Sequence, residues 1–163
     1  MGGLRMETLI YFLPCLYAFL ACAGICITLN IHGQGILICC VGGALGWFIY
    51  LLLAPIAGSE VVQSFFAAVV ITLYAEIMAR VRKFPVTGYL LVALFPLVPG
   101  GGIYYTMEYC IQGETQRFLE SLLHTFGVAG ALAVGAVLVS SGVRLLTSYR
   151  DSRRRTEREE EKP

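Results

Sequence analysis

The stretch ILICCVGGALGWFIYLLLAP, residues 36–55, contains no charged side chain. A helix rises about 1.5 Å per residue, so a run of this length crosses the ~30 Å hydrocarbon core of a bilayer. The apolar residues form a continuous run and not a stripe along one helix face. The stretch therefore predicts a transmembrane helix.

The composition of the whole chain points the same way. Of its 163 residues, 57% are hydrophobic and 14% are charged, whereas a soluble domain carries about 25% charged residues. A water-soluble fold of this length could not bury so much apolar surface. We therefore expect an all-α, multi-pass protein of the cell (inner) membrane, embedded in the lipid bilayer, with no nucleic-acid partner.

Four further segments have the same apolar character. The five predicted spans cover residues 8–29, 36–55, 61–79, 86–107 and 121–146. They form one transmembrane domain over residues 1–146, followed by a charged tail over residues 147–163. We expect Ser59 to cap the third span with Glu60 in its first turn, and Pro85 to precede the fourth.

The distribution of basic residues predicts the orientation. Lysine and arginine concentrate on the cytoplasmic side of membrane proteins. With the N-terminus outside and the C-terminus inside, ten of the twelve basic residues face the cytoplasm. These ten are Arg80, Arg82, Lys83, Arg144, Arg150, Arg153, Arg154, Arg155, Arg158 and Lys162, whereas Arg5 and Arg117 lie outside. The tail is expected to be a stop-transfer segment, with docking to anionic lipid or a partner as the alternative.

The predicted fourth span is interrupted by PLVPGGG, residues 96–102. Pro96 and Pro99 lack backbone donors, and the three glycines allow the backbone to unwind. An unpaired backbone group in lipid costs several kcal/mol, so such a break persists only against protein or a wet cavity. Transporters use broken helices in this way: the second half offers its N-terminus to an anion, and the first half offers carbonyls to a cation.

This break supplies the candidate substrate-binding residues. Free amides from Gly100 to Tyr104 would receive the carboxylate of an amino acid, and nearby hydroxyls would add hydrogen bonds. The candidates are Pro96, Pro99, Gly100, Gly101, Gly102, Tyr104 and Thr106. The alternative is a plain proline kink, or a helix end followed by a re-entrant turn.

Glu76 is the one carboxylate inside a predicted span. Acidic residues within membrane spans are rare and usually functional. Arg80 follows four residues later on the same helix face, which favours a salt bridge. We expect Glu76 and Arg80 to be a gating or coupling pair, and an interfacial ion pair with a snorkelling Arg80 is the alternative.

The remaining polar residues give less information about function. His32 and His124 are expected to serve as polar caps or interhelical hydrogen-bond partners, and Trp47 alone is a weak signal. Small residues on the second and fifth spans predict close helix packing, within the chain or against a partner such as a second copy. The sequence has no catalytic motif and no metal-ligand spacing among its six cysteines, so we expect neither an enzyme nor a bound cofactor.

The run from Glu76 to Thr106 resembles the threonine/serine exporter family. The resemblance rests on Arg80, Pro85, the block PLVPG at residues 96–100, and Tyr104. The chain looks like the small YjjB-type subunit, equivalent to the C-terminal half of the fused ThrE exporter. The resemblance covers nearly the whole chain and is weakest in the first two spans.

This resemblance implies a secondary transporter that exports small amino acids such as threonine and serine, driven by the proton gradient. It also implies a larger YjjP-type membrane subunit as partner. Some two-component relatives are associated with succinate export, so a dicarboxylate exporter subunit is one alternative. A non-transporting scaffold subunit of a membrane complex is the other.

Overall fold

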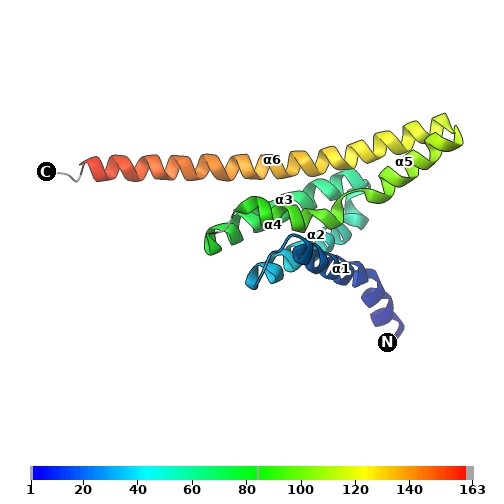
Figure 1. Cartoon of the computed structure of the whole chain (residues 1–163), viewed down its shortest axis with the longest axis horizontal. Helices are drawn as coiled ribbons and strands as arrows, with labels where there is room; N and C mark the ends of the chain where they lie inside the picture. Colours follow the sequence, from blue (N-terminus) through cyan, green and yellow to red (C-terminus); the bar gives the residue numbers. More distant parts are fainter. Residues whose placement is uncertain (1, 84, 161–163) are drawn as a thin grey trace.

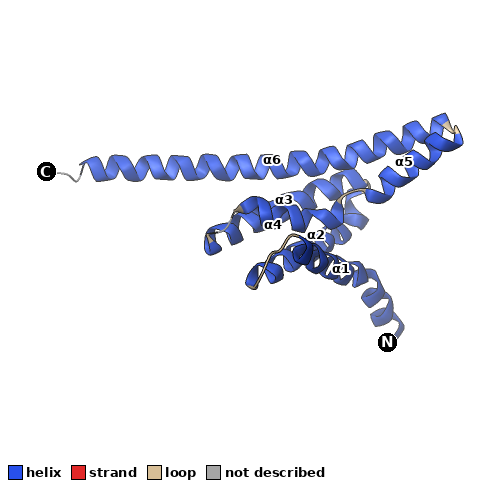
Figure 2. Ribbon diagram, in the orientation of Figure 1, coloured by secondary structure: helices blue, strands red, loops and turns tan. Residues whose placement is uncertain are grey.

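The computed structural model describes the backbone of residues 2–83 and 85–160, and the side chains of residues 10–83 and 85–150. Within these ranges every regular element is helical, and none is a strand (Figures 1 and 2). The elements are α1 (Gly2–Thr28), α2 (Gln34–Ala57), α3 (Glu60–Arg82), α4 (Val86–Leu94), the 3₁₀ turn η1 (Phe95–Leu97), α5 (Gly100–Gln112) and α6 (Thr115–Glu160).

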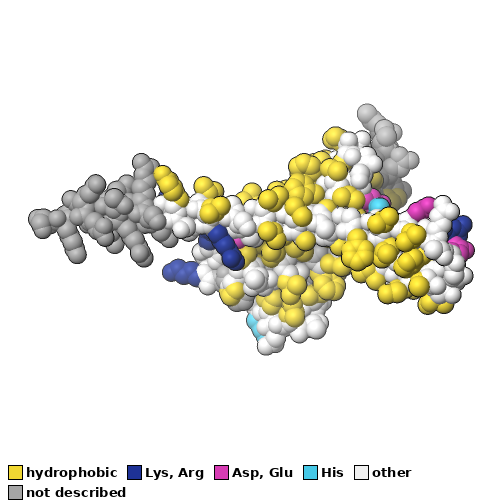
Figure 3. All heavy atoms as spheres, turned by 90° about the horizontal axis from the view of Figure 1, so that it is seen from above, with side chains coloured by type: hydrophobic (Ala, Val, Ile, Leu, Met, Phe, Trp, Pro, Cys, Tyr) yellow, Lys and Arg dark blue, Asp and Glu magenta, His cyan; other side chains and the backbone are white. Residues whose placement is uncertain are grey.

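The helices confirm a multi-pass membrane fold. The segments that are long and apolar enough to cross a bilayer are Ile10–Thr28, Gln34–Ala57, Glu60–Arg82 and Thr115–Arg150. The bent pair Val86–Leu97 and Gly100–Gln112 supplies a fifth if it is counted as one span. On the face seen in Figure 3, apolar side chains are spread over the described part of the molecule, and charged ones lie mainly toward the two ends of that part. The predicted orientation remains a prediction.

Two helix ends lie beyond the predicted spans. The fourth span is predicted to end near residue 107 and the fifth to begin near residue 121, whereas helix α5 continues to Gln112 and α6 starts at Thr115. Glutamate and glutamine are frequent among the intervening residues and are good helix formers, and side-chain hydrogen bonds between residues four apart support both helices. The polar residues therefore end the apolar run, but the helices extend into the polar segment. Gly113, with φ of 75°, makes the turn.

Helix α3 begins as predicted, with Ser59 at the N-cap position and Glu60 in the first turn, but the Ser59 side chain makes no capping hydrogen bond. Its carbonyl oxygen accepts instead from the Gln63 amide at 3.2 Å. Pro85 precedes α4 as predicted. The tail is helical as far as Glu160, and its side chains from residue 151 onward lie outside the described residues, so lipid docking stays a prediction.

Small residues bring the helices together. A Cβ at Gly43 would collide with the Cys22 thiol of α1, and one at Gly46 would collide with Ile71 of α3. On α6, a Cβ at Gly135 would lie 2.9 Å from the Phe65 carbonyl oxygen of α3. Only glycine permits these approaches, which are typical of helix packing in membranes.

Helices α3 and α6 run side by side in the same direction. Glu60 at the start of α3 lies opposite His124, and Arg80 near its end lies opposite Thr147. Helix α5 packs on the first part of α6 (Figure 1). Because His124 is nine residues into α6, this α5–α6 hairpin projects about 14 Å beyond the start of α3.

Candidate functional site

The predicted break is present between α4 and α5. Helix α4 ends at Leu94, η1 follows over Phe95–Leu97, and α5 resumes at Gly100 with its axis turned by 53°. Neither Pro96 nor Pro99 has an amide with which to continue the helical ladder. The chain therefore changes direction inside the helix bundle.

The carbonyl side of the break is largely satisfied within the protein. The Val92 oxygen accepts from the Phe95 amide and lies 3.4 Å from the Cys22 thiol that donates to it. The Phe95 oxygen accepts from Val98 at 3.2 Å, and the Pro96 oxygen accepts from the Trp47 indole nitrogen at 3.3 Å. These acceptors are engaged, so the first half of the broken helix offers little to a cation.

The amide side is different. We expected free amides from Gly100 to Tyr104, but Gly100 donates to the Val98 oxygen at 2.7 Å and Ile103 donates to the Pro99 oxygen at 3.1 Å. Among the described residues, no backbone acceptor is found for the amides of Gly101 and Gly102. Such amides form the positive end of a helix. The break thus offers donors, which suit an anion.

A cavity of about 210 Å³ adjoins this end of α5. Five elements line it: α2, α3, η1, α5 and α6. Its residues are Trp47, Tyr50, Glu60, Ser64, Pro96, Leu97, Val98, Pro99, Gly100, Gly101, Gly102, His124 and Val128. Ligand pockets for drug-sized molecules measure roughly 300–1,000 Å³, so this one suits a small solute.

The three glycines of the break differ in their surroundings. A Cβ at Gly100 or Gly101 would meet open space, whereas one at Gly102 would lie 2.5 Å from the Thr125 hydroxyl of α6. Gly102 therefore lets α5 approach α6, and Gly101 leaves room beside an unpaired amide. The glycine run serves packing at one position and leaves space at the others.

A contact between a histidine of one helix and a carboxylate of another adjoins the same cavity. The His124 Nε2 atom of α6 lies 3.4 Å from a carboxylate oxygen of Glu60 in the first turn of α3. Both side chains are about half exposed. The expected interhelical role of His124 matches this contact. Sequence reasoning placed Glu60 only in the first turn of the third span and did not connect the two residues.

Not all predicted candidates meet at the cavity. Pro96, Pro99 and Gly100–Gly102 line it, but Tyr104 and Thr106 do not. Tyr104 is exposed, and the buried Thr106 hydroxyl bonds the Gly102 carbonyl at 2.7 Å and the Ser121 hydroxyl at 2.8 Å. Thr106 lies one helical turn after Gly102, on the face that packs against α6.

Residues from other elements complete the cavity and were missed. Trp47 and Tyr50 come from α2, and Ser64 comes from α3. The one available signal was the Trp47 indole N–H, a donor that needs a partner within an apolar span. That partner is the Pro96 carbonyl, forty-nine residues away, which the sequence does not identify.

The Glu76–Arg80 pair lies elsewhere. Glu76 is buried, and its carboxylate lies 3.8 Å from an Arg80 nitrogen that also donates to the Thr147 hydroxyl at 2.8 Å. Sixteen residues separate Glu76 from Glu60 along α3, which is about 24 Å. The pair joins α3 to α6 at the opposite end from the Glu60–His124 contact.

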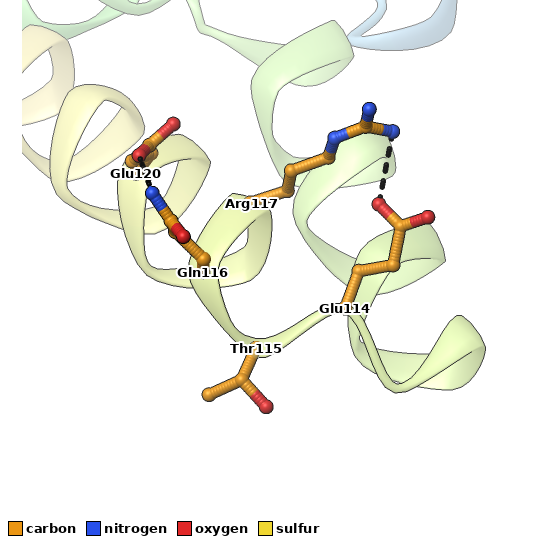
Figure 4. Close-up of a pocket in the computed structure, with 5 residues that line it drawn as sticks. All are labelled: Glu114, Thr115, Gln116, Arg117 and Glu120. Atoms are coloured by element: carbon orange, nitrogen blue, oxygen red, sulfur yellow. Dashed lines mark hydrogen bonds and ion pairs between the residues drawn. The ribbon is translucent and has the colours of Figure 1, made fainter.

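The hollow at the α5–α6 turn is a less suitable site (Figure 4). Arg117 pairs with Glu114 at 3.0 Å, and the Gln116 amide donates to Glu120 at 3.1 Å. Thr115 points away from the other four side chains. The charged groups already have partners, so this hollow is a solvated polar surface. No group of side chains in the described part of the chain is arranged to hold a metal ion.

Comparison with known proteins gives a match to a protein family. A family model described as "Threonine/Serine exporter, ThrE" matches residues 14–141. That range is more than half of the chain, and it contains the helix break, the whole cavity lining and the Glu76–Arg80 pair. Searches of the curated proteins and of the solved structures found no match to the chain.

Proposed function

Because the chain belongs to the threonine/serine exporter family, we propose that it carries small amino acids outward through the cavity at the helix break. The family is one of membrane transporters, and the apolar helices fit a multi-pass transporter of this kind. The finer proposal concerns which residues meet the substrate and what drives it.

One observation carries the proposal. The unpaired amides of Gly101 and Gly102 lie at the positive end of α5, beside a cavity of about 210 Å³. A substrate carboxylate placed there would accept hydrogen bonds from donors that are fixed in advance. Pro96 and Pro99 hold the break open, since neither can donate to a regular helix.

The driving force in this proposal is the proton gradient, with Glu76 and Arg80 as the gate at the other end of α3. Arg80 joins the two helices by holding Glu76 on α3 and Thr147 on α6. Loss of the Arg80 contacts would let the paired helix ends separate. A buried carboxylate paired at 3.8 Å with a half-exposed arginine is suited to such a change of state.

A larger membrane subunit is the proposed partner. Helix α5 packs on α6 and exposes Tyr104, Met107 and Ile111 on its remaining surface. A second membrane subunit would cover this surface and close the cavity against lipid. Co-purification of a tagged chain with a larger hydrophobic subunit of the same family would support the assignment, and isolation of a fully active chain without it would contradict it.

The proposed function is tested by efflux of labelled threonine from proteoliposomes that contain the chain and its partner. Gly101→Leu places a side chain in the open space beside the free amides and is expected to abolish efflux. Gly130→Leu is the matched control, because its Cβ on α6 also meets open space but lies outside the cavity. Normal efflux in Gly101→Leu would remove the break from the transport path.

A further inference from the structure

We infer that the Glu60 carboxylate is a shared site for which the ammonium group of the substrate and the protonated His124 side chain compete. The inference rests on the proposed function, since it concerns the same cavity. It assigns specificity and proton linkage to Glu60 and His124, neither of which belongs to the helix break itself.

The cavity has two electrostatic ends. The amides of Gly101 and Gly102 carry partial positive charge, and Glu60 contributes a carboxylate to the same lining. A free amino acid is a zwitterion with a matching pair of charges. Its carboxylate would face the amides, and its ammonium would face Glu60.

This arrangement also disfavours one alternative substrate. A dicarboxylate such as succinate would place its second carboxylate near Glu60, with no ammonium to offset the repulsion. Among the cavity-lining residues, Glu60 is the one carboxylate and His124 the one basic side chain. The lining therefore favours a zwitterion over a dianion.

His124 is the side chain that would bind the proton. Its Nε2 atom lies 3.4 Å from Glu60, and histidine is the side chain that ordinarily changes charge between about pH 5 and pH 8. A protonated imidazole would hold the carboxylate by a charge-assisted hydrogen bond, and a neutral one would hold it weakly. A protonated His124 therefore pairs with the Glu60 carboxylate, which is then not available to the ammonium group of the substrate.

Other ionisable groups near the pair do not replace it. Tyr50 of α2 lines the cavity, and Glu120 lies one turn before His124 on α6, where Gln116 donates to it at 3.1 Å. Helix α5 contributes glycines to the lining, which carry no charge. Glu60 is thus the acceptor placed to bind either cation.

Competition for one carboxylate is what proton-coupled exchange requires. A proton from the more acidic side binds the His124 nitrogen, and the imidazolium then pairs with Glu60 and displaces the ammonium group. The substrate leaves on that side. When the proton is lost on the other side, Glu60 is again available to a new substrate. The step makes and breaks no covalent bond except that to the proton.

The test measures binding of labelled threonine to the purified complex at about pH 8 and about pH 5.5. Competition predicts weaker binding at the lower pH. His124→Gln is expected to bind threonine equally at both pH values. Glu60→Gln should weaken binding at both. Glu120→Gln is the matched control, a nearby carboxylate outside the cavity, and should keep the wild-type pH dependence.

A second ligand separates the role of the ammonium group. The carboxylate 3-hydroxybutyrate lacks the amine of threonine, so its binding should not weaken at the lower pH in the way that threonine binding does. Equal threonine affinity at both pH values in the wild-type complex would overturn the inference. If Gly101→Leu still abolished efflux, the proposed function would stand without it. If the complex neither bound nor exported threonine, both would fall.

Discussion

The indole nitrogen of Trp47 on α2 lies 3.3 Å from the carbonyl oxygen of Pro96 in the helix break. In a continuous helix that oxygen would accept from the amide four residues later, which belongs to Gly100. Gly100 donates instead to the Val98 oxygen at 2.7 Å. Helix α2 thus supplies a donor that the interrupted helix has lost, and this contact favours the broken conformation.

Trp47→Phe is expected to destabilise the protein by about 1–2 kcal/mol, because it leaves the Pro96 oxygen without its donor. Phenylalanine keeps an aromatic ring beside Tyr50, whose ring centroid lies 5.3 Å from that of Trp47. The measurement is the thermal unfolding midpoint in detergent. An unchanged midpoint would mean that the contact does not support the break.

Gly101→Ala and Gly102→Ala should differ in their effects on stability. A Cβ at Gly102 would lie 2.5 Å from the Thr125 hydroxyl, so Gly102→Ala should cost about 1–3 kcal/mol through overpacking. A Cβ at Gly101 meets open space, so Gly101→Ala should leave stability unchanged or raise it by up to about 1 kcal/mol. Thermal unfolding of both variants checks this, and equal effects would contradict the described α5–α6 packing.

The two members of the Glu76–Arg80 pair should not respond alike to substitution. Arg80→Met leaves the buried Glu76 carboxylate without its cation and also removes the bond to Thr147. We expect a loss of about 2 kcal/mol, larger than that of Thr147→Val, which removes the hydroxyl that accepts from Arg80 and donates to the Val143 carbonyl. Glu76→Gln should cost least, because no buried charge is left unpaired. Unfolding midpoints that rank in another order would contradict this arrangement.

Cys110 offers a direct test of the predicted orientation. It is exposed on α5 near the hairpin turn, whereas Cys22, Cys26, Cys39 and Cys40 are buried. With the hairpin outside, a membrane-impermeant maleimide should label the chain in intact cells, and Cys110→Ser should remove that labelling. Labelling only after the cells are opened would reverse the orientation.

Much of this fold could be predicted from the sequence, because lipid imposes simple requirements on a chain. Uncharged runs such as residues 36–55 must be helices, since no other local structure satisfies their backbone groups in hydrocarbon. The break at Pro96 and Pro99 was predictable for the same reason, since proline has no amide to donate. The boundaries near Gln112 and Thr115 were not, because a polar segment can be helical or irregular.

The site was harder to predict, because its parts come from distant elements. The glycines of the break gave a local signal, and they do line the cavity. The contact between Glu60 and His124 depends on α3 and α6 running side by side, sixty-four residues apart in the chain. The rotation of each helix about its own axis determines which side chains face the cavity. For example, the Thr106 hydroxyl contacts the Ser121 hydroxyl outside the cavity. No single-sequence pattern specifies which faces of two helices will meet.

The central claim is that substrate binds at the break, and substrate protection of a cysteine at Gly101 tests it most directly. Gly101→Cys would be made with Cys15 and Cys110 replaced by serine, leaving the four buried thiols in place. A charged methanethiosulfonate reagent should modify the new thiol, and threonine should slow that reaction while transport-inert solutes do not. Modification at a rate that threonine leaves unchanged, in protein that still exports threonine, would contradict the account.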